Sequence, residues 1–288
     1  MKKYVLYNPY AGNDGGEESA KKLDAHYIGQ ELVFCDVTEI SDFREFFSST
    51  SEDDDIIICG GDGTLNRFIN SIDGIDIKNN ILYYATGSGN DFLHDLGKPN
   101  GSEPFQINKY IEKLPYMYIG DGRCRFINGI GYGLDGHVCE MVNNSKKKKQ
   151  NSYLLYAIKA ILFSYRPRNA TVTVDGVSKQ YTNVWLSPTM KGKFFGGGMM
   201  IAPERSREKE SLSVVIVHSC NKFKLLRILP TVFKGTHIRF KKYVEIHHAK
   251  EVTIEYDNPC ALQVDGETVS DVKSYTARAA SRAAALTK

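Results

Sequence analysis

The chain has 288 residues, of which 42% are hydrophobic and 25% are charged. This composition is ordinary for a globular protein and excludes a mostly disordered chain, a collagen-like repeat and a small disulfide scaffold. The 37 Lys and Arg residues against 34 Asp and Glu residues give a formal net charge of +3, which is too small to indicate a nucleic-acid partner. Two domains are expected at this length, and no apolar stretch approaches the roughly 20 residues that span a bilayer.

The N-terminal segment begins as a signal peptide does, with two lysines and a short apolar run, but Asn8-Pro9 ends the run too early. The six cysteines are widely spaced and form no C-x-x-C pair. Cys35 and Cys59 end apolar runs that are typical of buried strands. We therefore expect free buried thiols and a cytoplasmic location.

The first third of the chain alternates between strand and helix patterns. Ile56–Cys59 is uniformly apolar, which is typical of a strand buried on both faces of a parallel sheet. The alternation predicts a doubly wound α/β domain over residues 1–118. Strands are expected at Lys3–Tyr7, Leu32–Cys35, Ile56–Cys59 and Ile81–Ala85, and helices at Glu17–Tyr27, Phe43–Phe47, Leu65–Ile72 and Asp91–Leu96.

The rhythm changes beyond about residue 115, where strand patterns dominate. Asp175-Gly176 lies between two of them and predicts a hairpin turn. We expect an antiparallel β-rich second domain over residues 119–288, whose last residues pack back on the first; the tail from Ala277 shows no strand pattern and is expected to be helical or frayed. Strands are expected at Pro115–Ile119, Arg123–Ile127, Ala170–Val174, Tyr181–Leu186, Ser213–His218, Tyr243–His247, Glu251–Tyr256 and Ala261–Val264, and helices at Asp135–Asn143, Tyr153–Phe163 and Lys224–Phe233.

The most informative motif is Gly60-Gly61-Asp62-Gly63-Thr64, between the Ile-rich strand and the next helix. Glycines let the backbone approach a ligand closely, and the N-terminus of a helix offers unpaired N–H groups to a phosphate. Asp62 adds a carboxylate that would hold a metal or accept a proton. Asn8–Gly12 and Thr86–Asp91 follow the first and fourth strands in the same way. Turns at the carboxyl ends of parallel strands meet at one edge, so the three together indicate a nucleotide site.

Three further features are less decisive. The four lysines at Lys146–Lys149 are typical of a solvated loop, or alternatively of a segment attracted to an anionic membrane. His247 and His248 are adjacent in a strand and point to opposite faces, so we expect structural roles. Phe194-Phe195 is expected to lie in the core, with a lipid slot as the alternative.

Taken in order, these motifs resemble the diacylglycerol kinase catalytic family, soluble bacterial lipid kinases related to sphingosine and ceramide kinases. The resemblance covers nearly the whole chain. The G-G-D-G-T element alone is shared with NAD kinases and phosphofructokinases, whereas the ordered set is specific. Besides the three turns, the set includes Asn128–Asp135, Gly196–Pro203, Lys234–His237 and Val264–Glu267.

The resemblance implies an NAD kinase/diacylglycerol kinase-like fold, with ATP on the α/β domain and lipid on the β-rich domain. It places Glu267 as the general base that activates the lipid hydroxyl, with Asp62 and Asp265 as further catalytic candidates and Asp135 nearby. ATP would be used as its Mg²⁺ complex, and contact with the inner membrane face would be peripheral. The implied nucleotide contacts are Asn8, Pro9, Gly12, Thr38, Gly61, Asp62, Gly63, Thr64, Ser88 and Asn90.

One departure from the family pattern lies at residues 208–214. The family usually carries D-G-x-L-D-V here, and its first Asp helps to bind a structural Mg²⁺. Lys209 stands at that position and Ser213 replaces the second Asp. An ammonium group cannot ligate Mg²⁺, so we predict that this metal site is lost.

The leading hypothesis is an ATP-dependent lipid kinase that transfers the γ-phosphoryl group to the hydroxyl of diacylglycerol or a similar lipid. A second is a nucleotide- or lipid-binding protein that has lost catalysis, which Lys209 motivates. A third is a kinase for a soluble substrate such as NAD, against which the motifs of the second domain argue. The sequence leaves the lipid species and the oligomeric state open, a homodimer included.

Overall fold

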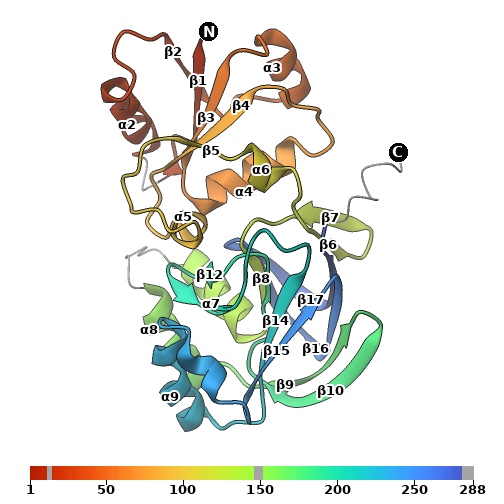
Figure 1. The fold of residues 1–288 in the computed structure, drawn as a ribbon. Helices are drawn as coiled ribbons and strands as arrows, with labels where there is room; N and C mark the ends of the chain where they lie inside the picture. The colour runs from red at the N-terminus through yellow and green to blue at the C-terminus, as the bar shows by residue number, and fades with distance from the viewer. Residues whose placement is uncertain (12–14, 146–151, 281–288) are drawn as a thin grey trace. The chain divides into compact units, whose positions relative to one another are not determined.

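The structure is a computed structural model that describes residues 1–11, 15–145 and 152–280. The chain divides into two compact units, Met1–Lys113 and Leu114–Lys288 (Figure 1). Among the described residues no helix is long and apolar enough to cross a membrane. The predictions made for Gly12, for Lys146–Lys149 and for the tail from residue 281 lie outside the described residues.

The first unit is built on a five-stranded sheet with the order β2-β1-β3-β4-β5. Its first four strands run parallel and β5 is antiparallel to β4, so the predicted doubly wound sheet is confirmed. The strands are β1 (Lys3–Tyr7), β2 (Leu32–Asp36), β3 (Asp55–Gly60), β4 (Asn80–Ala85) and β5 (Phe105–Gln106). The helices are α2 (Gly16–Lys21), α3 (Phe43–Ser49), α4 (Asp62–Ser71), α5 (Asp91–Asp95) and α6 (Asn108–Ile111), with a 3₁₀ turn η1 (Lys22–Ala25).

Side chains along β1 alternate between two faces of this sheet, and helices cover both. Val5 packs with Ala20 and Leu23, which lie in α2 and η1. Tyr4 meets Phe46 of α3 edge to face, with ring centroids 5.7 Å apart. Every residue of β3 is buried, as expected for a central strand covered on both sides.

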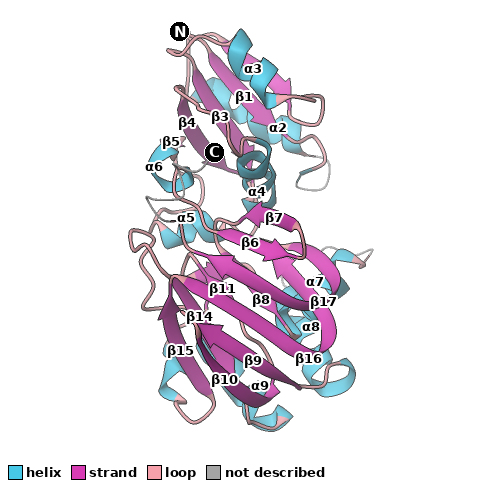
Figure 2. Cartoon of the chain, turned by 90° about the vertical axis from the view of Figure 1, so that its right-hand side faces the viewer, coloured by secondary structure: helices cyan, strands magenta, loops and turns pink. Residues whose placement is uncertain are grey.

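The second unit is dominated by an antiparallel sheet with the order β15-β14-β11-β8-β16-β17-β6-β7, to which β9 and β10 add through β16 (Figure 2). A separate small hairpin joins β12 to β13. The strands are β6 (Tyr116–Ile119), β7 (Gly122–Arg125), β8 (Gly129–Tyr132), β9 (Arg168–Val174), β10 (Val177–Val184), β11 (Thr189–Met190), β12 (Phe194–Phe195), β13 (Met199–Met200), β14 (Leu212–Val217), β15 (Val244–Ala249), β16 (Glu251–Val264) and β17 (Glu267–Arg278). The helices are α7 (Leu134–Asn143), α8 (Ser152–Lys159), η2 (Ala160–Ser164), α9 (Lys222–Val232) and η3 (Thr236–Arg239).

Two hydrophobic cores are found among the described residues of this unit. One lies between strands, where Tyr132, Tyr256 and Tyr275 pack ring against ring. The other lies between the sheet and the helices α7, α8 and α9. Phe195 belongs to the second core, as predicted, whereas Phe194, predicted with it, is half-buried.

Two strand predictions at the end of the chain were wrong. β16 runs through residues 251–264, where two strands were expected, because it continues past Pro259 with a shift of register. Ala277 and Arg278 belong to β17 and pair with both β16 and β6. β17 is mostly exposed, so its sequence lacks the apolar alternation by which a strand is recognised.

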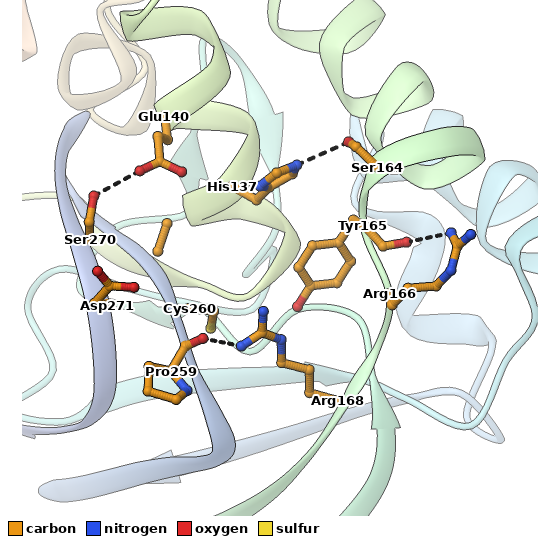
Figure 3. A pocket seen from close by; sticks show the side chains of 11 residues that line it. His137, Glu140, Ser164, Tyr165, Arg166, Arg168, Pro259, Cys260, Ser270 and Asp271 are labelled. Atoms are coloured by element: carbon orange, nitrogen blue, oxygen red, sulfur yellow. Dashed lines mark hydrogen bonds between the residues drawn. The ribbon is translucent and has the colours of Figure 1, made fainter.

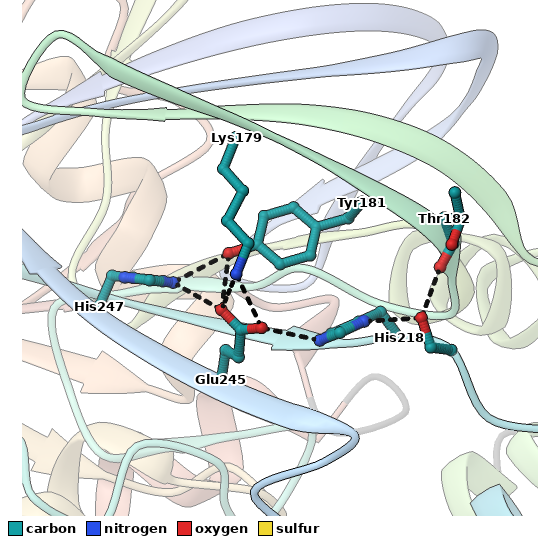
Figure 4. A network of polar contacts seen from close by, with 7 residues as sticks. Lys179, Tyr181, Thr182, His218, Glu245 and His247 are labelled. Atoms are coloured by element: carbon teal, nitrogen blue, oxygen red, sulfur yellow. Dashed lines mark hydrogen bonds and ion pairs between the residues drawn. The ribbon is translucent and has the colours of Figure 1, made fainter.

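A polar cluster joins β10 to β15, which are not neighbours in the sheet order (Figure 4). The carboxylate of Glu245 accepts hydrogen bonds from Lys179 Nζ at 2.7 and 3.0 Å and from the Tyr181 hydroxyl at 2.9 Å. His218 and His247 each bring an Nε2 atom within 3.2 and 3.4 Å of the same carboxylate. His247 therefore belongs to a polar cluster that links two strands, which is a structural role.

Candidate nucleotide and acceptor sites

The three turns singled out in the sequence follow β1, β3 and β4 of the first unit. These strands are parallel, and their last residues lie side by side in the sheet: Tyr7 is paired with Cys59, and Gly60 with Ala85. The turns therefore begin at one edge of the sheet. This edge carries most of the residues predicted to contact the nucleotide.

The turns after β3 and β4 touch backbone to backbone. A Cβ atom at Gly87 would lie 2.5 Å from the Cα atom of Gly61, and one at Gly61 would lie 3.1 Å from the Cα atom of Gly87. The N–H of Thr86 donates to the carbonyl of Gly60 at 3.0 Å. A side chain at either glycine would separate the turns, so the glycines bring both backbones to the same place.

Asp62 reinforces this junction. It opens α4, and its carboxylate accepts hydrogen bonds from the N–H groups of Asp91 at 2.7 Å and Phe92 at 3.0 Å, at the start of α5. Both carboxylate oxygens thus satisfy backbone donors that the first turn of a helix leaves without intrahelical partners. The sequence predicts that Asp62 is a metal ligand or proton acceptor, and this geometry adds a positioning role.

Asn90, in the turn after β4, has a side-chain oxygen that accepts no hydrogen bond. It adopts a left-handed conformation with φ of 47°, and its Nδ2 atom donates to the Gly87 carbonyl at 2.7 Å and to Asn100 Oδ1 at 3.1 Å. The residue is only 2% exposed, and its Oδ1 atom has no hydrogen-bond partner. A buried amide oxygen without a donor is costly, so a donor from a ligand or water is expected at this position.

The remaining predicted nucleotide residues lie on the same edge in different environments. Asn8 Oδ1 accepts from the N–H of Tyr10 at 3.0 Å and shapes the first turn, which Pro9 continues. Thr38 follows β2, and both its N–H and its hydroxyl donate to Asp36 Oδ1. Thr64 is buried against Gly60, whereas Ser88 is exposed. Gly63 has open space beside it, since a Cβ there would meet nothing within 4 Å.

In the second unit, Asp265 anchors the hairpin that joins β16 to β17. Asp265 and Gly266 have φ values of 47° and 96°, as a two-residue primed turn requires. The Asp265 carboxylate accepts from three consecutive N–H groups, those of Ile127, Asn128 and Gly129, at 2.6, 2.9 and 2.9 Å. The carboxylate predicted to act in catalysis is therefore engaged with backbone, and it fixes the hairpin against the start of β8.

Asp135 lies under the same hairpin and is 4% exposed. Its Oδ2 atom accepts from Gln263 Nε2 at 2.8 Å, and Gln263 Oε1 accepts from the N–H of Gly266 at 2.7 Å. Its Oδ1 atom is buried without a partner. Burial raises the pKa of Asp135 to about 7, although the hydrogen bond from Gln263 acts in the opposite direction. Gly131 makes room for this carboxylate, because a Cβ there would clash with Asp135 Oδ2.

Glu267 is the first residue of β17 and is exposed. Burial, and then the charges of Asp135 and Glu267, raise the pKa of the Cys139 thiol to about 12. Cys139 itself contacts the Gly266 carbonyl at 3.2 Å. The hairpin thus gathers three carboxylates: Asp135 is buried, Asp265 is engaged with backbone N–H groups, and Glu267 is exposed.

The segment that contains Lys209 is organised by a neighbouring arginine. Arg205 is 2% exposed, and its guanidinium group donates to the carbonyls of Lys191 at 3.0 Å and Lys209 at 2.9 Å and to the carbonyl and hydroxyl of Ser211. The Lys209 residue is exposed. Within the described part of the chain, no group of three or more His, Cys, Asp or Glu side chains is arranged to hold a metal ion.

The second unit also contains a cavity of about 390 Å³ between α7 and the middle of β16 (Figure 3). His137, Tyr165, Arg168 and Cys260 line it, and Arg168 donates to the carbonyls of Asn258 and Pro259. Basic and acidic side chains are mixed around it, since Glu140 and Asp271 also contribute. None of the residues predicted from the sequence for the nucleotide or for catalysis lines this cavity.

Three residues of these sites were not predicted from the sequence. Asn100 holds the Asn90 amide, Gln263 links Asp135 to the hairpin, and Arg205 binds the carbonyls of the 203–211 segment. No local motif marks any of them, and Gln263 acts on a residue 128 positions away in the chain.

A parallel α/β unit with joined glycine-rich turns, followed in the chain by an antiparallel unit with a carboxylate-bearing hairpin, defines the NAD kinase/diacylglycerol kinase-like class. Residues 2–115 match the family model of the diacylglycerol kinase catalytic domain. Residues 128–286 match that of the YegS C-terminal NAD kinase beta sandwich-like domain. The chain therefore belongs to the diacylglycerol kinase catalytic-domain family, a family of kinases, as its motifs predicted.

Individual relatives agree with this assignment. The chain is 24% identical over 267 residues to a diacylglycerol kinase of Mycobacterium tuberculosis, covering 87% of this chain and 84% of the relative. It is 26% identical over 272 residues to a diacylglycerol kinase of Bacillus subtilis, covering 91% and 88%. A crystal structure of a diacylglycerol kinase from Bacillus anthracis shares the fold, with a TM-score of 0.65 at 19% identity over 98% of both chains.

Proposed function

We propose that this protein transfers the γ-phosphoryl group of ATP to the hydroxyl of diacylglycerol or a similar lipid. The observation that carries the proposal is the close contact between the turns that contain Gly61 and Gly87. Asp62, the first residue of α4, holds these turns together through its hydrogen bond from the N–H of Asp91. Backbone N–H groups at such a helix start bind phosphate, and glycines allow the phosphates to approach. The names of the relatives supply the lipid class, and the unused Asn90 Oδ1 atom offers an acceptor to a nucleotide amino or hydroxyl group.

In this proposal the first unit binds the nucleotide through Asn8, Pro9, Thr38, the Gly61–Thr64 turn, Ser88 and Asn90. Asp62 positions the turns, because its two oxygens are engaged with the N–H groups of α5. Phosphoryl transfer depends mainly on such positioning and on neutralising the phosphate charge. Mg²⁺ fits as a companion of the nucleotide, held mostly by phosphates and water, and would neutralise the charge that develops on the transferred group.

The second unit binds the acceptor in this proposal. Glu267 takes the general-base role, since its carboxylate is exposed. Glu267 is also the first residue of β17, and the hydrogen bonds of Asp265 to the backbone hold the start of this strand in place. A carboxylate within hydrogen-bond reach of the attacking hydroxyl accepts its proton during transfer. Asp265 then acts through the backbone as a positioning residue, and Asp135 supports the hairpin through Gln263.

The test is transfer from γ-labelled ATP with Mg²⁺ to a lipid panel, with NAD as a soluble acceptor. Glu267→Gln should lower kcat on the order of 10²–10⁴-fold and leave ATP binding unchanged. Glu255→Gln is the matched control, because Glu255 is an exposed glutamate on the partner strand β16 that pairs with Lys273. Labelled NADP would favour a soluble-substrate kinase. Nucleotide binding with no labelled product would favour a protein that has lost catalysis.

A further inference from the structure

Three large apolar side chains are exposed on two neighbouring helical segments of the second unit. Leu155 on α8 is 66% exposed, Phe163 on η2 is 73% exposed and Phe223 on α9 is 70% exposed. Leu155, Lys159 and Phe163 follow one another at intervals of four residues, so they lie near one face of the helical segment. α9 packs against η2, and Figure 1 shows α8 and α9 on the same side of this unit.

The exposed side chains are not displaced core residues. The same helical segments bury a separate apolar face in the core against the sheet, with Ala157, Ala160 and Ile161 on one segment and Leu225 and Ile228 on the other. A helix that already buries one apolar face and exposes aromatic and leucine side chains on another presents an interaction surface.

The helical segments that carry these side chains contain basic residues and no acidic ones. Residues 152–168 contain Lys159, Arg166 and Arg168, residues 221–242 contain seven Lys or Arg, and neither segment contains an Asp or Glu. The whole chain is nearly balanced, with 37 basic and 34 acidic residues, so the excess here is local. Lys222 Nζ lies 5.6 Å from the centre of the Phe223 ring, which places cation and aromatic group together.

We propose that this α8–α9 surface, formed by Leu155, Lys159, Phe163, Lys222, Phe223 and Arg227, docks onto an anionic lipid bilayer. Phe and Leu side chains enter the boundary between head groups and acyl chains, while Lys and Arg remain with the anionic head groups. A second copy of the chain fits less well, since a twofold contact would set one wholly basic patch against another. The inference rests on the proposed function and deepens it, because it names the surface that reaches the membrane in which the acceptor lies.

The test is sedimentation of the 288-residue chain with vesicles of phosphatidylcholine alone and of phosphatidylcholine with 30% phosphatidylglycerol, on the order of the anionic content that attracts basic surfaces. The protein should bind the anionic vesicles at least about tenfold more tightly, and added salt should weaken this binding. The double variant Phe163→Gln with Phe223→Gln should lose about tenfold or more in affinity, and so should Lys222→Glu with Arg227→Glu. Far-UV circular dichroism and the thermal midpoint identify any variant that fails to fold.

Matched controls come from the same unit. Val177 is 73% exposed on β10, and Lys250 lies exposed in the turn between β15 and β16. Val177→Gln and Lys250→Glu each make one change of the same kind, apolar to polar or a charge reversal, outside the proposed surface and should leave vesicle affinity within about twofold of the parent. Equal losses in these controls, or unchanged affinity in the surface variants, would overturn the proposal.

Two further measurements separate this inference from the proposed function. Transfer to a short-chain diacylglycerol in detergent micelles should persist in the surface variants, because micelles need no docking. Turnover in micelles without vesicle binding by the parent protein would refute the docking proposal alone, and vesicle binding without turnover would refute the kinase proposal alone.

Sedimentation equilibrium tests whether the surface instead binds a second copy of the chain. Variants that dissociate a dimer and keep vesicle affinity would assign the surface to a second copy instead.

Discussion

The carboxylate of Asp62 and the backbone N–H of Asp91 are joined by a 2.7 Å hydrogen bond, although the two residues open different helices. The bond fixes the turn after β3 against the turn after β4, where Gly61 and Gly87 already touch. A residue whose motif predicts a metal ligand or a base therefore also clamps two glycine-rich turns of the proposed site together. Its removal should therefore disturb nucleotide binding as well as turnover.

Asp62→Ala should lower the free energy of unfolding by about 1–2 kcal/mol, since two N–H groups at the start of α5 lose their acceptor. It should also raise the Kd for ATP, because the turns are no longer held together. Asp62→Asn keeps one acceptor oxygen and should have an intermediate effect on both. Urea unfolding and isothermal titration calorimetry measure the two quantities. Asp76→Ala, at a carboxylate 82% exposed, is the control and should change neither.

If Asp62 acted only in chemistry, Asp62→Asn would abolish turnover with parental stability and parental ATP affinity. That result would contradict the positioning role.

Asp265 offers a second test of a carboxylate engaged with backbone. Asp265→Asn should cost roughly 2–3 kcal/mol of stability, because three N–H groups lose a charged acceptor. Asp265→Ala should cost about 1 kcal/mol more, since alanine is strained at a φ of 47° where asparagine is tolerated. Urea denaturation measures the series. Equal stability of the two variants would show that neither the left-handed conformation nor the amide oxygen that asparagine retains contributes.

The fold was largely predictable because its signals are local. Ile56–Cys59 is apolar throughout since helices cover both sides of β3, and the glycines of the three turns lie in contiguous motifs. The motif order also gave the family. β8 was missed because Gly129-Ile130-Gly131-Tyr132 is too rich in glycine to resemble a strand, although it is buried throughout.

What the sequence did not reveal is which carboxylates are already engaged. In the sequence, Asp62, Asp135 and Asp265 are all aspartates within glycine-rich motifs, and nothing there distinguishes their hydrogen bonding. Their hydrogen bonds go to groups between 29 and 138 residues away along the chain, and only the folded backbone brings these groups together. Gln263, the partner of Asp135, carries no motif of its own for the same reason.

Arg205 should be the least replaceable residue of the 203–211 segment. Its buried guanidinium group reaches three carbonyls and a hydroxyl, and a lysine has neither the fork geometry nor enough donors for them. Arg205→Lys should lower stability by about 2–4 kcal/mol. Lys209→Ala, which changes the exposed side chain at the expected metal position, should be close to neutral. Thermal denaturation with and without Mg²⁺ or a chelator, in the absence of nucleotide, checks both. A large chelator effect would contradict the predicted loss of the structural metal.

Asp135 should make stability fall with rising pH. Its carboxyl group titrates near pH 4 in the unfolded chain and with a pKa of about 7 in the folded one, so the folded state binds more protons between these values. Stability then declines as pH rises from about 4 to about 7, by an amount on the order of a few kcal/mol, and levels off above. Asp135→Asn should remove this decline. Denaturant titrations from acid to neutral pH measure it, with exposed Asp121→Asn as the control. Parallel profiles for parent and Asp135→Asn would refute the assignment.

Glu245 should have the opposite pH dependence. Partial burial would raise its pKa, but the hydrogen bonds from Lys179 and Tyr181 and the charges of Lys179 and His218 prevail and lower it to about 2. The unfolded value is near 4.5, so the ionised carboxylate stabilises the fold above about pH 4.5, and this contribution is lost as pH falls toward 2. Glu245→Gln should therefore cost about 1–2 kcal/mol at neutral pH and progressively less in acid. Urea unfolding at several pH values measures the difference, with Glu251→Gln, at a glutamate paired with Arg278 on the surface, as the control. A cost that stays constant down to pH 2 would mean that the cluster stabilises through shape and neutral hydrogen bonds, and not through the charge of Glu245.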